Sequence, residues 1–243
     1  MQNQSNAQQM DVLFRPIWNV KKNYLCGYII RLQQAAPAQT VETMAQRDLA
    51  LLQKGAEALV RLQQKGEKSV VVVPVGFETL NRYPGRGHYL AMLRRLPDDV
   101  RSFIVLQIGD IPLQASRKRL QSVQADVRGL CRALSFLTDV RGVHLDGVSR
   151  HNVHACVADL TLKAADEADM VGLVTRFADK AGGISCAAMA DGVATRAALM
   201  AALSAGYSYL AGPAVQEDQL ELGISRRDFV MQQALVPAEM YCH

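Results

Sequence analysis

The stretch MADGVATRAALMAALSAGYSYLAGPAV, residues 189–215, decides the fold of this 243-residue chain. It opens on an apolar strand that ends at an acidic residue, Asp191, followed by Gly-Val. A helix-forming segment, residues 194–206, comes next, and a second short apolar strand ends at Gly-Pro. A strand, a helix and another strand in this order form a unit with two parallel strands and a helix over one face of the sheet.

The same alternation extends through the chain upstream of this stretch. Residues 12–20 and 24–32 predict an opening β-hairpin around a turn at residues 21–23. Further strands are predicted at 69–75, 103–111, 142–148 and 159–165, and helices at 41–65, 89–96, 118–137, 170–183 and 225–235. Repeated strand–helix units require a parallel sheet, and about 250 residues is the usual length of a closed TIM-like (β/α)8 barrel. An open doubly wound sheet is the alternative, but no GxGxxG follows an early strand.

Composition excludes several classes of protein. The net charge is +4, from 27 basic and 23 acidic residues that are dispersed, so no nucleic-acid surface is expected. No apolar run reaches the roughly 18 residues that span a bilayer, so no membrane association is expected. Five cysteines without a CxxC pair are typical of reduced thiols and a cytoplasmic location. Residues 1–10 are polar and predict a disordered lead or linker, and residues 11–243 predict a single barrel domain.

The expected strand ends carry a recognisable series of motifs. In chain order they are FRPIW (14–18), GYIIRLQ (27–33), VPVG (73–76), LQIGD (106–110), LDGVS (145–149), Lys163, ADGVAT (190–195) and AGPA (211–214). This order resembles QPI, G-F/Y-E-A-L-x-R, VNLS, LEITE, LDDFG, KID, AEGVET and QGYL of EAL domains. These are TIM-barrel phosphodiesterase modules that cleave the bacterial second messenger cyclic-di-GMP. Asp146 and Lys163 are 17 positions apart, fewer than the family usually has, which predicts a shortened loop.

Many residues that the resemblance assigns to the site have been replaced. The lost family positions are Ile29 for Glu, Pro74 for Asn, Gly147 for Asp, Ala165 for Asp, Ala194 for Glu and Ala211 for Gln. EAL domains hold two divalent metals that activate a water, and such ions need several oxygen ligands close together. Of the matched metal positions Ile29, Pro74, Gln107 and Asp146, only Asp146 carries a charge. We therefore expect no catalytic residue, no metal site and no cofactor.

Six polar residues remain as candidates for a residual pocket: Asp146, Lys163, Asp191, Gln107, Asp110 and Arg31. The alternative is a buried Lys–carboxylate cluster, because isolated buried charges are costly. Arg31 could bind a phosphate or point outward between helices. His144, His151 and His154 fall close together, but solvated loop histidines are favoured over a zinc site.

The resemblance implies a degenerate EAL-like pseudoenzyme that serves in signal transduction. We expect it to act through protein–protein interaction, with a partner protein or a neighbouring domain of a longer chain, and binding of cyclic-di-GMP stays open. An active TIM-barrel enzyme with a rebuilt site at Lys163, Asp146 and Asp191 is one alternative, and residual cyclic-di-GMP hydrolysis is another. A third is a structural domain that forms a homodimer.

Overall fold

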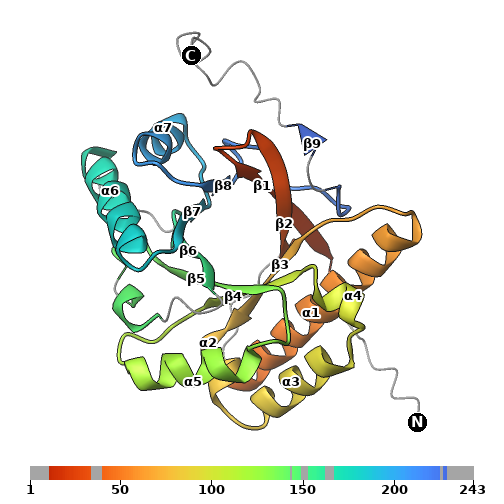
Figure 1. Cartoon of the computed structure of the whole chain (residues 1–243). Helices are drawn as coiled ribbons and strands as arrows, with labels where there is room; N and C mark the ends of the chain where they lie inside the picture. The colour runs from red at the N-terminus through yellow and green to blue at the C-terminus, as the bar shows by residue number, and fades with distance from the viewer. Residues whose placement is uncertain are drawn as a thin grey trace, which may run out of the picture.

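The computed structural model describes residues 11–33, 40–142, 144–148, 153–161, 167–224 and 227–228. Within these residues, eight strands form a closed barrel (Figure 1). They are β1 (Val12–Asn19), β2 (Tyr24–Leu32), β3 (Val71–Gly76), β4 (Ile104–Gly109), β5 (Ala133–Asp139), β6 (Val153–Asp159), β7 (Ala187–Asp191) and β8 (Tyr209–Ala211). Neighbours from β2 to β8 are parallel, and β1 closes the ring by pairing antiparallel with both β2 and β8.

The helices surround the strands on the outside of the barrel (Figure 1). They are α1 (Val41–Gln64), α2 (Phe77–Asn81), α3 (Gly85–Arg95), α4 (Asp98–Arg101), α5 (Arg117–Val127), α6 (Glu167–Gly183) and α7 (Arg196–Ser204), with a 3-10 turn η1 at Leu145–Gly147. The expected barrel with its opening hairpin is confirmed. In the described residues, no helix is both long enough and apolar enough to cross a bilayer.

Local sequence explains where the first elements begin and end. Asn23 has φ 50° in the turn of the β1–β2 hairpin, a conformation that Asn tolerates better than most residues. Thr40 caps α1, because its hydroxyl accepts from the backbone N–H of Thr43 while the Thr43 hydroxyl accepts from the N–H of Thr40. Gly66, at φ 75°, ends this helix.

Strand residues alternate between the helices and the interior of the barrel. Val71, Val73 and Val75 of β3 pack in the core under the helices, whereas Val72 points into the barrel. The apolar layer inside the barrel is formed by Ile17, Ile29, Val72, Val105, Ala155, Val157, Met189 and Ala211. This layer separates the carboxyl end of the barrel, where β2–β8 finish, from the amino end, where they start.

Four expectations about the elements were wrong, three of them between residues 118 and 165. The helix predicted at 118–137 ends at Val127, Gly129 adopts φ 75°, and the chain then forms β5. Residues 142–148 contain the turn η1 instead of a strand. The sixth strand lies at Val153–Asp159, and residues 160–161 of the strand expected at 159–165 are not in a strand, while residues 162–165 lie outside the described residues.

The last expected helix, 225–235, is also wrong where the structure describes it. Arg227–Asp228 form a short strand, β9, that pairs antiparallel with Tyr24 and Leu25 of β2. The other residues of that prediction lie outside the described residues, as do residues 1–10.

Candidate functional site

An ion-pair network occupies the carboxyl end of the barrel. Arg15 of β1 is 5% exposed and donates from Nη1 to Asp191 Oδ1 at 2.9 Å. Its Nε donates to Asp218 Oδ1 at 2.8 Å and its Nη2 to Asp218 Oδ2 at 3.2 Å. Arg31, at the end of β2, lies 3.8 Å from Asp218. Two arginines and two carboxylates therefore meet above the apolar layer, and we call them the Arg15 network.

Electrostatics in the Arg15 network follow from burial. Burial raises the pKa of the Asp191 carboxyl, and the positive charge of Arg15 only partly offsets this effect. The negative charge of Asp159 acts in the same direction as burial. Burial by itself would lower the pKa of Arg15, but the two carboxylates together outweigh this effect and raise the pKa, so this guanidinium stays protonated.

Below this network, the strand ends present few polar groups. Ile29 and Ala211 are buried in the apolar layer, and Pro74 of β3 is half-buried. Gln107 of β4 stands beside Pro74 and Ser135 in the strand register. It is 1% exposed, and its Nε2 has no hydrogen-bond partner among the described residues.

The structure does not bring the other expected site residues together. Asp146 lies in η1, not at a strand end, and the space beside Gly147 is filled by Leu120 of α5. Ala194 is exposed in the loop before α7. Lys163 and Ala165 lie outside the described residues, and so does His151.

The fifth and sixth strand ends carry two carboxylates that the sequence analysis missed. Asp139 ends β5 and accepts from Arg141, at 2.8 Å from Nε and 2.7 Å from Nη2. These hydrogen bonds lower the pKa of Asp139. Asp159 ends β6 and accepts from the backbone N–H of Thr161 at 2.8 Å and from its hydroxyl at 2.5 Å. Each carboxylate is engaged by a group that follows it closely in the chain.

A second buried carboxylate, Asp48 of α1, supports the neighbouring strand ends. It accepts from the backbone N–H of Gly76 at 2.8 Å and from the Thr79 hydroxyl at 2.6 Å. Arg47 contacts Asp48 at 3.1 Å and Asp110 at 3.4 Å. Asp110 is thus drawn toward α1, and its side chain is 59% exposed.

The sequence motifs predict few of these contacts. Arg15 stands in the FRPIW motif, beside the proline that matches the family pattern, and this motif was the available signal for it. Asp218 and Asp48 belong to no motif, because one lies in a loop and the other faces inward from a helix.

The chemistry available at the carboxyl end is limited. Within the described ranges, no three His, Cys, Asp or Glu side chains come together as a metal site would require. The carboxylates of Asp139, Asp159 and Asp191 accept from Arg141, Thr161 and Arg15 respectively. His144 lies in the turn before η1, whereas His154 is the second residue of β6, at the opposite end of the barrel.

Comparison with solved structures identifies the same fold in EAL domains. The EAL domain of Mycobacterium smegmatis DcpA is 14% identical, with a TM-score of 0.66 over 86% of this chain and 93% of that one. Bacillus subtilis YkuI, a protein with an EAL domain solved with cyclic-di-GMP and calcium, is 13% identical, with a TM-score of 0.68. The match covers 88% of this chain and 56% of YkuI.

A third similar structure is the Xanthomonas citri FimX EAL domain in complex with cyclic-di-GMP. It is 17% identical, with a TM-score of 0.63 over 85% of this chain and 87% of that one. No family model matches the sequence, and no curated protein matches it. At these identities the likeness shows a shared fold.

Proposed function

We propose that this chain is a non-catalytic EAL-like module that works in signalling by binding a protein partner. The partner is a separate protein or a neighbouring domain of a longer chain. The observation that carries the proposal is the Arg15 network, which places a buried guanidinium and its two carboxylates at the carboxyl end of the barrel. Barrel enzymes bind substrate at that end.

The matched metal positions support the same conclusion. Ile29 and Pro74 offer no side-chain oxygen, and Gln107 offers one neutral oxygen. A divalent ion such as Mg²⁺ is dehydrated reluctantly and is held by carboxylates in most sites. The first three strand ends that would hold the metals therefore supply no negative charge.

Strand order revises the assignment of the other acidic positions. β5 and β6 are the fifth and sixth strands and end at Asp139 and Asp159, which supports assigning these two residues, in place of Asp146 and Ala165, to the LDDFG and KID aspartates. Three carboxylates then remain on β5, β6 and β7, counting Asp191. Each would have to exchange its present partner for a metal, and the proposal is that none does so.

Calorimetry and a hydrolysis assay test this proposal together. We expect no saturable heat when cyclic-di-GMP is added to about 100 μM, a limit that excludes micromolar affinity. We also expect no linear product from cyclic-di-GMP with Mg²⁺ or Mn²⁺ present. Turnover that disappears in both Asp139→Asn and Asp159→Asn would refute the non-catalytic assignment.

Binding of cyclic-di-GMP without cleavage is the second candidate. The side chain of Arg31 is 35% exposed at the carboxyl end, where its guanidinium could contact a phosphate. Micromolar or tighter binding, lost in Arg31→Gln, would favour this function over the protein-only one. A light-scattering mass equal to one chain would exclude the homodimer.

A further inference from the structure

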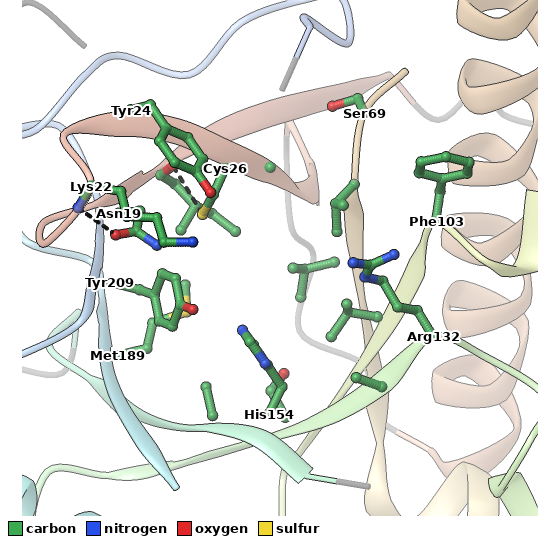
Figure 2. A pocket seen from close by; sticks show the side chains of 18 of the residues that line it. Asn19, Lys22, Tyr24, Cys26, Ser69, Phe103, Arg132, His154, Met189 and Tyr209 are labelled. Atoms are coloured by element: carbon green, nitrogen blue, oxygen red, sulfur yellow. Dashed lines mark hydrogen bonds between the residues drawn. The ribbon is translucent and has the colours of Figure 1, made fainter. Parts of the chain in front are cut away.

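A cavity of about 1030 Å³ opens at the amino end of the barrel, on the far side of the apolar layer from the Arg15 network. Figure 2 shows side chains from β1, β2, β6, β7 and β8 converging on it, together with Arg132 just before β5. TIM-barrel interiors are normally filled by bulky branched side chains. Here several lining positions carry small residues, and the cavity is the space that they leave beside Ile17, Val72 and Val105. The small residues are Cys26, Gly27, Ala133, Ser135 and Ala155.

The charge of the cavity is one-sided. Lys22, Lys68, Arg132 and the imidazole of His154 line it, and among the described residues no Asp or Glu does. In the part of the chain that the structure describes, none of these four side chains forms an ion pair with a carboxylate. Arg132 donates from Nη1 to the backbone oxygen of Ser102 at 3.2 Å, and it and His154 point toward the centre of the cavity in Figure 2.

The inner end of the cavity contains a hydroxyl group whose hydrogen-bonding capacity the described residues do not use. Ser135 lines the cavity, is 3% exposed, and its Oγ has no partner among the described residues. Buried hydroxyls are normally paired, so a polar atom of a ligand or a water is required there. Tyr24 and Tyr209 add two phenolic side chains to the walls, and Phe103 adds an apolar ring.

We propose that the amino end of this barrel binds a small organic phosphomonoester whose body is aromatic or apolar. The cations at the rim hold the phosphate, since guanidinium and ammonium groups are the preferred partners of such a dianion. The aromatic walls receive the body, and Ser135 donates or accepts at the inner end. The volume suits a nucleotide-sized molecule, because ligand pockets usually measure about 300–1,000 Å³. This site is independent of the function proposed for the carboxyl end.

The test uses adenosine 5′-monophosphate and phenyl phosphate as probes, titrated against the full chain by calorimetry and by amide NMR shifts. We expect saturable binding of at least one probe below about 1 mM, weakening as salt rises. Adenosine and inorganic phosphate are expected to bind at least about tenfold more weakly, because each lacks one half of the ligand. The shifted amides should include Gly27, Ser135 and Ala155.

Matched variants separate the cavity from general charge effects. Arg132→Gln should weaken binding by at least about tenfold, which corresponds to one lost charge-assisted contact. Arg128→Gln removes the same charge from an exposed site four residues earlier that does not line the cavity, and should change affinity less than about twofold. Ala155→Leu fills the cavity and should abolish binding, while its melting temperature shows that the barrel is intact.

Three results would overturn the proposal. They are the absence of saturable binding by either probe up to about 10 mM, equal losses in Arg132→Gln and Arg128→Gln, and shifts confined to residues near Arg15 and Asp191. The last result would place the ligand at the carboxyl end.

Discussion

Arg15 carries the positive charge that holds two carboxylates, Asp191 and Asp218, at the carboxyl end of the barrel. Its side chain is 6% exposed, so its interactions are only weakly screened by solvent. Removing one partner of such a pair is costly because the remaining charge stays buried.

Replacing Arg15 with Gln should therefore lower the free energy of unfolding by about 3 kcal/mol at pH 7, as measured by urea denaturation. The deficit should shrink toward pH 4, because a protonated Asp191 needs no cation. The control Arg31→Gln removes a charge that is 3.8 Å from Asp218 and one-third exposed. Its expected cost is below about 0.5 kcal/mol, and equal costs for the two variants would contradict the central role of Arg15.

His154 is a titratable group at the amino end whose surroundings all disfavour its protonated form. Burial lowers its pKa, and the positive charge of Arg132 lowers it further. Its ring lies 5.3 Å from that of Tyr209. The other titratable groups that line the same cavity are Lys22, Tyr24, Cys26 and Lys68.

The lowered pKa of His154 predicts a pH effect with a definite sign. The unfolded chain binds a proton with the ordinary pKa of about 6.5, more tightly than the folded chain, so stability falls as pH drops through that value. Between pH 7.5 and 5.5, His154→Gln should gain about 1 °C in melting temperature relative to the original chain. If the difference in melting temperature between the two proteins does not change with pH, His154 has the same pKa in the folded and the unfolded chain.

Helix α1 is joined to the turn between β3 and α2 through Asp48. This side chain is fully buried, and burial raises its pKa although the hydrogen bonds from Thr79 and Gly76 lower it in part. The two donors have no solvent to replace Asp48 if it is removed. The contact therefore fixes how the first long helix packs against the strand ends.

Asp48→Ala should lower the free energy of unfolding by about 3 kcal/mol, because the N–H of Gly76 and the hydroxyl of Thr79 lose their acceptor. Denaturation in urea measures the change. Glu57→Gln is the control on the same helix, since the contacts of Glu57 with Gln53 at 2.9 Å and Lys54 at 3.7 Å are both exposed, and it should cost less than about 0.5 kcal/mol. Similar losses in both would show that the anchoring by Asp48 is weak.

The elements that sequence patterns predicted well are those with strong local signals. The β-branched run before Gly76 became β3, and the long amphipathic pattern closed by Gly66 became α1. The helix predicted at 118–137 was too long because residues that favour helices continue past the end of α5. Gly129, at φ 75°, was the signal that could have divided it into α5 and β5.

That one error displaced the fifth and sixth strand ends. It led the motif comparison to Asp146 and Lys163, which are only 17 positions apart, whereas the assignment that we propose uses Asp139 and Asp159. Matches at Ile29, Pro74, Gln107 and Asp191 did not depend on it. The Arg15 network and the amino-end cavity depend on long-range packing, which no local pattern reports.

The whole barrel divides into two ends with opposite properties. At the carboxyl end, ion pairs and hydrogen bonds engage the polar side chains of Arg15, Asp139, Asp159 and Asp191. At the amino end, small inward residues leave a solvent-accessible space lined by cations. The hairpin turn at residues 20–23 lies at this end, and Lys22 from that turn lines the space.

The small inward residues at the amino end have an evolutionary consequence. In barrel enzymes, lineages diversify at the carboxyl-end loops while the opposite end is conserved for stability. In this chain, a library of substitutions should show the opposite pattern, with constraint by the ligand at the amino end and tolerance in the carboxyl-end loops. Substitutions that enlarge Ala133 or Ala155 should be selected against because they block the proposed ligand, although the chain still folds. Substitutions in the loops after β4 and β5 should be tolerated.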